Sequence, residues 1–369
     1  MGDVGVLFGG PSPEHDVSVL TGLQAAHEFL AMGRRTVAIY WTKVGSFVEV
    51  DPALEASAFL EGAPKGSTPL TLSVADGGGF IAEGGRLRGA RSLEIEALVL
   101  CTHGGPGEDG TLQGALDLAG VPYSGPSVSG ASLGMDKLAF GAVMTLADIP
   151  SLPRIPLTEQ TMAVNFDGPY IVKPRFGGSS IGIDVVADLD VARARLSANV
   201  HLANGAVLEP YRPDLADLQV AARTYPTLEI SAIERPLRAS ASGEILGYAD
   251  KYVGGEGMAS APRELPADLP ADRVAAMRDM AARVVAVCDV RGVARIDFLA
   301  NDDELYVNEI NTIPGSLGRY LFIEPPVSFG QLLDDLVAEA VRSPTHRYSA
   351  AGADGLVLRG AASIAAKLA

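Results

Sequence analysis

The chain has 369 residues, of which 47% are hydrophobic and 20% are charged, with a formal net charge of -16. This length predicts two or three domains. The acidic balance excludes proteins that bind nucleic acids or anionic membranes through a basic surface, because no surplus of cations is present. Cys101 and Cys288 lie inside separate apolar runs, which is typical of free thiols in a reducing compartment. With no signal-peptide pattern and no membrane-length apolar run, we expect a cytoplasmic protein.

The first third of the chain alternates strand-like and helix-like patterns, and its first and third strands end in glycine-rich turns. The predicted elements are strands at 4–8, 36–42 and 97–102 and helices at 17–32 and 111–119. Strand, turn and helix in this order indicate a parallel sheet that binds ligands beyond the carboxyl ends of its strands. We therefore predict an α/β protein whose first domain, residues 1–125, is Rossmann-like.

Two further units are predicted after this domain. Pro126 and Ser127 open a helical pattern that ends before Pro150, which is typical of a capped helix linking two domains. The following patterns are strands at 170–174, 181–187, 206–211, 220–222 and 228–233 and helices at 189–199, 271–288 and 328–342. We place the central unit at 126–205, the last unit at 206–345 and an apolar tail at 346–369.

Two strand-like runs near the end of the chain, 295–299 and 305–311, are separated by a turn-forming Asn-Asp-Asp sequence. Side chains of a strand alternate between two faces, so Arg295 shares a face with Asp297, and Glu309 with Asn311. If the runs pair as a hairpin with these faces aligned, two carboxylates, an amide and a guanidinium converge. Such oxygen ligands suit Mg²⁺ bound together with nucleotide phosphates. The alternative is a hairpin with a solvated polar face, but the apolar flanking residues favour a buried sheet.

A lysine and a loop of small residues follow the apolar strand of the central unit. Lys173 lies at the end of this strand, and Gly177–Gly182 joins it to the next strand. A fixed cation beside flexible backbone N–H donors is suited to binding phosphates. A plain hairpin turn needs only about two to five residues and explains neither the lysine nor the paired serines. The pattern therefore favours nucleotide binding.

Three better-known motifs are excluded. Gly105–Gly110 matches a dinucleotide fingerprint, but it carries two carboxylates where a pyrophosphate would lie. Gly178–Gly182 matches the nucleophile elbow of hydrolases, but a strand pattern follows it where a helix is required. The chain also has no Gly-Lys-Ser or Gly-Lys-Thr sequence, so it has no P-loop. Other single residues, such as Lys137 and His103, are more typical of a surface lysine and a structural histidine.

Six blocks in the chain share their order and spacing with one known family. They are Val6–Ser18, His103–Gly114, Leu133–Lys137, Lys173–Gly182, Lys251–Tyr252 and Arg295–Gly315. Together they resemble the D-alanine–D-alanine ligase family of ATP-grasp enzymes, and they span nearly the whole chain. The resemblance implies a three-domain ATP-grasp fold with ATP held between the central and last domains. It implies that ATP phosphorylates one amino-acid carboxylate and that the amine of a second amino acid attacks the acyl phosphate.

The resemblance also implies roles for individual residues. Asp297, Glu309 and Asn311 would hold two Mg²⁺ ions, while Arg295 and the backbone N–H of Gly315 would stabilise the oxyanion. The expected ATP contacts are Lys137, Lys173 and Lys251 at the phosphates, Glu209 at the adenine and Asp217 at the ribose. The expected ligand of the first ammonium is Glu14, linked to Ser179 and Tyr252. A homodimer is also implied.

The chain departs from the family where the second amino acid is expected to bind. Arg319 and Tyr320 follow Gly315 where small hydroxyl residues are usual, and Arg319 introduces a cation suited to a carboxylate. The ribose segment around Asp217 differs from the usual pattern, and Gly177 stands where an acidic residue is common. The leading hypothesis is D-alanyl-D-alanine synthesis for peptidoglycan. The alternatives are a specialised dipeptide or amide ligase, a depsipeptide-forming ligase disfavoured by Tyr252, and a non-catalytic nucleotide-binding regulator.

Overall fold

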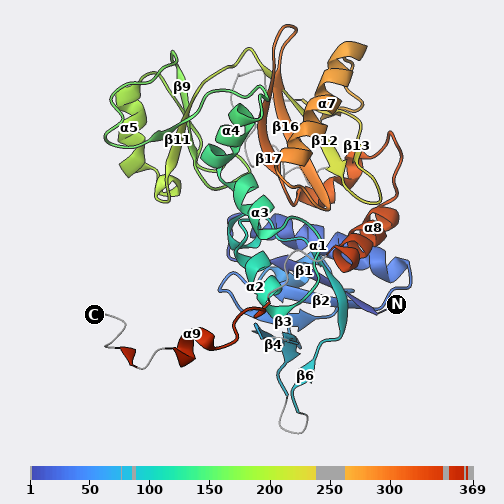
Figure 1. Ribbon diagram of the computed structural model, residues 1–369. Helices are drawn as coiled ribbons and strands as arrows, with labels where there is room; N and C mark the ends of the chain where they lie inside the picture. The colour runs from blue at the N-terminus through green and yellow to red at the C-terminus, as the bar shows by residue number, and fades with distance from the viewer. Residues whose placement is uncertain are drawn as a thin grey trace.

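The computed structural model describes residues 2–75, 77–84, 89–237, 262–343, 349–360 and 363–364. The described residues form three units, with the central and C-terminal units side by side above the N-terminal unit (Figure 1). Among these residues no helix has the length and apolar character needed to cross a bilayer.

The N-terminal unit contains a seven-stranded sheet in the order β6-β5-β4-β3-β2-β1-β7. The predicted parallel sheet is confirmed for β2 (Thr36–Trp41), β1 (Asp3–Gly9) and β7 (Ile95–Leu100). Four strands that the sequence patterns did not predict extend this sheet in antiparallel pairs. Antiparallel neighbours can be joined by short hairpin turns, whereas parallel neighbours need longer crossover connections. The four strands are β3 (Phe47–Val50), β4 (Thr68–Ser73), β5 (Gly79–Ala82) and β6 (Arg91–Ser92).

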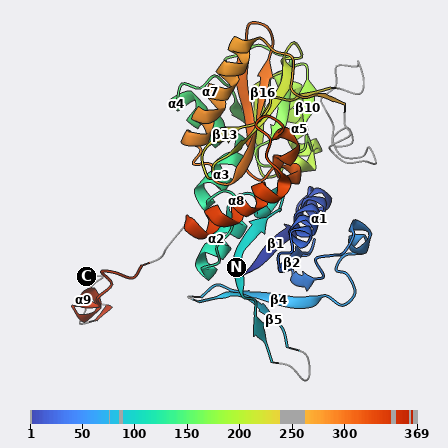
Figure 2. The same cartoon turned by 90° about the vertical axis from the view of Figure 1, so that its right-hand side faces the viewer.

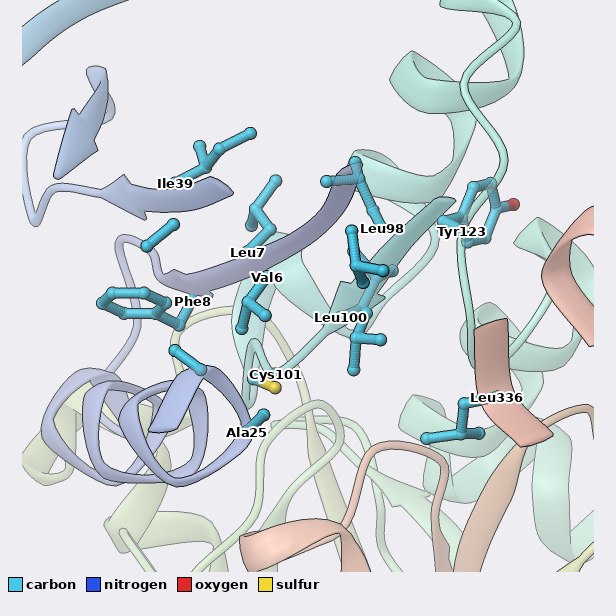
Figure 3. Packing of buried hydrophobic residues seen from close by; sticks show 14 of the residues in the cluster. Val6, Leu7, Phe8, Ala25, Ile39, Leu98, Leu100, Cys101, Tyr123 and Leu336 are labelled. Carbon is cyan, nitrogen blue, oxygen red and sulfur yellow. The ribbon is translucent and has the colours of Figure 1, made fainter. Parts of the chain in front are cut away.

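Helices from opposite ends of the chain meet on this sheet. α1 (His15–Ala31) packs on β1, and α8 (Phe329–Arg342) contacts both β7 and α1. Figure 3 shows Leu336 of α8 as a member of the buried cluster that also contains Val6, Leu100 and Ala25. Although α8 follows the C-terminal sheet in sequence, its apolar face therefore completes the N-terminal core.

Both cysteines are buried and free, as predicted.

The predicted linking helix is two helices, α3 (Val128–Met135) and α4 (Lys137–Leu146). They follow α2 (Thr111–Ala119). Asp136 between them has an extended backbone, and its carboxylate accepts hydrogen bonds from the N–H groups of Leu138 and Ala139. The same carboxylate pairs with the Arg175 guanidinium at 2.8 and 2.5 Å. An N-cap inside the apolar pattern thus ends one helix and begins the next.

The central sheet is antiparallel, in the order β10-β9-β11-β8. Its strands are β8 (Ile155–Leu157), β9 (Tyr170–Pro174), β10 (Asp184–Val186) and β11 (Ala206–Pro210), and α5 (Leu189–Ala198) packs on it. Because β11 pairs with both β9 and β8, it belongs with the central unit and not with residues 206–345, where we had placed it.

The C-terminal sheet has the order β13-β12-β16-β17 and is covered by α7 (Ala271–Val287). Its strands are β12 (Ala216–Arg223), β13 (Glu229–Ile230), β16 (Val293–Ala300) and β17 (Leu305–Asn311), with a separate pair formed by β14 (Arg235–Pro236) and β15 (Arg263–Glu264). The short 3₁₀ turns are Ala56–Phe59, Gly105–Gly107, Val200–Leu202 and Gly315–Leu321. The tail carries α9 (Leu356–Arg359), which extends away from the body in both views (Figure 2).

The contribution of α8 to the N-terminal core is testable. Leu336 is 3% exposed and Val341, on the same helix, is 45% exposed. Leu336→Ala is expected to lower the free energy of unfolding by about 3 kcal/mol, because it leaves a cavity beside the sheet. Urea unfolding followed by the fluorescence of Trp41, the single tryptophan of the chain, measures this effect. Val341→Ala should cost less than about 0.5 kcal/mol, and equal effects of the two changes would contradict the packing.

Candidate active site

The hairpin predicted near the end of the chain is confirmed by the pairing of β16 with β17. Arg295 lies opposite Asn311 and Asp297 lies opposite Glu309, with an irregularity in the ladder after Asp297. Directly opposed residues of an antiparallel pair point to the same face. The backbone register therefore brings the four predicted polar side chains together.

The oxygen atoms of this group are held by hydrogen bonds. The Arg295 guanidinium donates to both carboxylate oxygens of Asp297 at 2.7 and 2.8 Å, and the Asn311 amide donates to Asp297 at 3.2 Å. The described part of the chain contains no cluster of three or more His, Cys, Asp or Glu side chains that would hold a metal alone. Two carboxylates and one amide fit Mg²⁺, which usually completes its coordination with water and substrate phosphates.

Two predicted lysines lie near this hairpin. Lys137, the first residue of α4, donates to the Gly177 carbonyl at 2.5 Å and lies 3.8 Å from the Glu309 carboxylate. Burial lowers the pKa of Lys137, and the carboxylate of Glu309 opposes this shift. Lys173 on β9 pairs with Glu209 of β11 at 2.7 Å. The break in the linking helix thus places a lysine at a helix start that faces the predicted phosphate loop.

Arg154, which the sequence patterns did not single out, joins the same cluster. Its Nε lies 3.5 Å from Glu209, and its guanidinium donates to the backbone carbonyls of Lys137 and Asn308. Burial opposes ionisation of Glu209, but the charges of Lys173 and Arg154 hold its pKa below the usual value. No local sequence pattern indicates this role for Arg154, because its partners are distant in sequence.

Most of the predicted ATP-site residues line one cavity between the central and C-terminal sheets. It is lined by Lys137 and Lys173, by polar residues of the hairpin and by apolar residues such as Ile171, Leu218 and Leu299. A cavity lined by apolar side chains together with several cations is suited to a nucleotide. The predicted residues on its wall are Lys137, Lys173, Glu209, Asp217, Arg295, Asp297 and Glu309.

A second, smaller cavity lies where the N-terminal unit meets the hairpin. Its wall includes Glu14, Ser179 and Gly315, and it shares Arg295 and Glu309 with the larger cavity. The Ser179 hydroxyl donates to the Glu14 carboxylate, the contact that the resemblance implied. Ser179 has a positive φ of 54°, a conformation that is uncommon for residues other than glycine. The central loop is therefore bonded to the N-terminus of α1 across the domain boundary.

His103 is a structural histidine in this wall, as its sequence context indicated. Nδ1 faces the Ile313 carbonyl at 2.8 Å, and Nε2 faces the Thr21 hydroxyl at 2.8 Å. Because a carbonyl only accepts, Nδ1 carries the proton and Nε2 accepts from Thr21. Burial lowers the pKa of His103 to about 4, so the ring is neutral near pH 7. Thr21 in turn accepts a hydrogen bond from the backbone N–H of Ser316.

Glu108 holds the same segment from the N-terminal unit. Its carboxylate accepts from the backbone N–H groups of Ile313 and Gly104 and from the Thr312 hydroxyl. Burial and the nearby charge of Glu14 raise the pKa of Glu108 to about 7. The sequence patterns did not assign Glu108 a role. The structure gives it one, because it fixes the backbone that leads to Gly315.

Lys251 and Tyr252 lie outside the described residues. Arg319 is exposed and stacks on the Phe329 ring, 4.8 Å from its centroid, and it lines neither cavity. Our expectation that Arg319 binds a substrate carboxylate is therefore corrected, because its side chain packs on α8. Tyr320 does line the larger cavity.

Comparisons with known proteins agree with this geometry. Family models described as the D-ala D-ala ligase N-terminus and C-terminus match residues 3–126 and 126–341. The D-alanine–D-alanine ligase B of Bradyrhizobium diazoefficiens is 33% identical, over 91% of this chain and 92% of the relative. The solved D-alanine–D-alanine ligase from Helicobacter pylori matches with a TM-score of 0.71 at 23% identity, over 94% of this chain and all of that one. The VanG D-Ala:D-Ser ligase structure from Enterococcus faecalis matches with a TM-score of 0.74 at 23% identity, over 92% of this chain and 99% of that one.

The fold is thus that of the ATP-grasp enzymes, and the protein is an ATP-dependent ligase. The chain belongs to the D-alanine–D-alanine ligase family.

The raised pKa of Glu108 predicts a pH-dependent stability. Its ordinary value is 4.5, so the folded protein binds this proton more tightly than the unfolded chain does. The contribution to stability is fully present below about pH 4.5 and is lost as the pH rises through about 7. Glu108→Gln removes this titration. The free energy of unfolding of Glu108→Gln, relative to that of the wild type, should therefore increase by up to about 3 kcal/mol from about pH 5 to pH 8.

Urea unfolding across this pH range measures the effect. The exposed Glu159→Gln controls for the loss of one carboxyl group. If the difference between wild type and Glu108→Gln is the same at every pH, Glu108 does not titrate as described.

Proposed function

We propose that this protein joins two D-alanine molecules in the cytoplasm, with ADP and phosphate as the other products, for peptidoglycan synthesis. The single observation that carries the proposal is that Arg295 and Glu309 line both cavities. A carboxylate bound in the smaller cavity would meet the phosphate end of a nucleotide bound in the larger one. The family membership supports the same reaction.

The larger cavity would hold ATP. Lys137 and Lys173 line it and would bind the phosphates, while Glu209 and Asp217 would bind the adenine and the ribose. Asp297, Glu309 and Asn311 would hold two Mg²⁺ ions. Metal held by these residues would neutralise charge on the transferring phosphoryl group. The terminal P–O bond of ATP breaks as a carboxylate oxygen of the first amino acid takes the phosphoryl group.

The smaller cavity would hold the first amino acid. Glu14 carries the charge suited to its ammonium group, and Ser179 fixes the Glu14 carboxylate. When the amine of the second amino acid attacks the carbonyl carbon, negative charge moves to the carbonyl oxygen. Arg295 and the N–H of Gly315 would stabilise that oxyanion before phosphate leaves. Glu108 and Thr21 act as positioning residues, because they hold the backbone on both sides of Gly315.

The second amino acid is the finer part of the proposal. One solved structure with this fold is named a D-Ala:D-Ser ligase, so the fold alone does not select D-alanine twice. Phosphate release measured with ATP and a panel of D- and L-amino acids, singly and in pairs, tests the choice. We expect D-alanine alone to support turnover. If D-alanine supports no phosphate release and another pair of amino acids does, a specialised dipeptide ligase is favoured. We also propose a homodimer, which sedimentation equilibrium would test.

The metal assignment predicts that Glu309→Gln loses turnover. Removing one anionic oxygen ligand weakens the stabilisation of the transferring phosphoryl group, so phosphate release should fall by about a hundredfold or more. Asp303→Asn, an exposed change in the turn of the same hairpin, should keep wild-type activity. Circular dichroism spectra of both variants should match the wild type. Full activity of Glu309→Gln would refute the assignment.

A further inference from the structure

One corner of the larger cavity contains a partly buried cation that the reaction described above does not use. Arg263 of β15 lies with its guanidinium carbon 4.8 Å from the centroid of the Tyr320 ring. Its Nη1 lies 3.0 Å from the Glu234 carboxylate, and the two side chains are only 14% and 4% exposed. Glu234 is itself held by the side-chain amide of Gln219. The corner is therefore a fixed array and not a mobile surface charge.

The phenolic oxygen of Tyr320 faces this corner without a partner. It is buried and has no hydrogen-bond partner among the described residues. Nearly all buried polar groups in proteins are hydrogen-bonded, so an orphan hydroxyl on a cavity wall indicates a missing ligand. Burial raises the pKa of Tyr320, with the charges of Arg295 and Arg263 opposing the shift. The phenol therefore stays protonated and is available as a donor.

The other described cations on the cavity wall are held elsewhere. Lys137 lies beside Glu309 and Lys173 pairs with Glu209, and we assign both lysines to the phosphates. The remaining two are Arg212, which pairs with Asp214 and Glu304, and Arg295, which pairs with Asp297. Of the described cations, Arg263 is the one that stacks on the Tyr320 ring.

We propose that Arg263 and Tyr320 bind the carboxylate of the second amino acid, with Glu234 positioning Arg263. This inference rests on the proposed function, because it requires an amino acid as the attacking amine. A guanidinium matches a carboxylate with parallel N–H donors, and the phenol adds a further O–H donor. Arg295, which we assign to the oxyanion, lines the same cavity as Arg263 and Tyr320. An amino acid held by its carboxylate in this corner would therefore share one cavity with the oxyanion residue.

The pairing of β14 with β15 distinguishes Arg263 from Arg235, the other arginine on these two strands. Arg263 is opposite Pro236 in the β14–β15 pair, whereas Arg235 is opposite Glu264 and pairs with it at 2.5 Å. Pro236 and Arg263 line the cavity, and Arg235 and Glu264 do not. Arg235 is therefore a matched control, because it is an arginine on the same two strands with its own carboxylate partner.

The test compares Arg263→Gln, Tyr320→Phe and Arg235→Gln in the full-length protein with ATP, Mg²⁺ and D-alanine. Phosphate release against D-alanine concentration gives separate KM values for the first and second molecules. Arg263→Gln should raise the second KM by about tenfold or more, because a hydrogen-bonded charge pair is lost. Tyr320→Phe should raise it by about threefold to tenfold. The KM values for ATP and for the first D-alanine should stay within about twofold, and Arg235→Gln should resemble the wild type.

A neutral acceptor gives a second readout that a structural role would not change. Wild type should prefer D-alanine over D-alaninamide as acceptor by about tenfold or more, and Arg263→Gln should lose most of this preference. Arg263→Lys keeps the charge and should retain part of it. An unchanged second KM and preference in Arg263→Gln, or a change in the KM for ATP instead, would overturn the inference.

Failure of the proposed function gives a different result. In that case wild type does not release phosphate with D-alanine, whatever the variants do. The amino acid that it does accept, compared with its own amide in wild type and Arg263→Gln, then tests the carboxylate site directly. Should no amino acid be accepted, the inference fails together with the function.

Discussion

The register of β16 against β17 is the constraint on which the site depends. Opposed residues of this pair set Asp297 against Glu309, and a slip of one residue would turn each polar side chain into the apolar core. The register is held from both sides, because β12 pairs along the whole length of β16 and α7 covers the sheet. The backbone register therefore brings these charges together, and the ion pair of Arg295 with Asp297 then fixes their side chains.

The N-terminal unit completes the site by holding the chain that follows β17. Three of its side chains, Glu108, His103 and Thr21, bond to backbone groups of Thr312–Ser316. α8 then returns to the N-terminal sheet and contributes apolar residues to its core. Because polar and apolar contacts both bridge the two units, the smaller cavity has a wall that neither unit could form alone. Burial of these contacts also explains the displaced pKa values of Glu108 and His103.

Local patterns in the sequence were sufficient to predict the hairpin and the main parallel strands, because each of these depends on alternation or on a strand followed by small residues. They also singled out Lys173, which lines the larger cavity. They were insufficient where one residue acts on distant parts of the chain. Asp136 lies in a helical pattern, but its backbone is extended and its carboxylate caps the next helix and pairs with Arg175, which is distant in sequence. Arg154 and Glu108 have no periodic signal at all, because their partners are set by tertiary packing. Local patterns also did not indicate that Arg319 is exposed, because its stacking on Phe329 depends on how α8 packs against the rest of the protein.

The two cavities share Arg295 and Glu309, and a common wall has a thermodynamic consequence. Any charge placed in one chamber changes the potential felt in the other. If nucleotide strengthens amino-acid affinity by some factor, amino acid must strengthen nucleotide affinity by the same factor, because a closed cycle of binding steps has no net free energy. Under the proposed function, the affinities for the two kinds of substrate would thus be coupled through the two side chains that both cavities share.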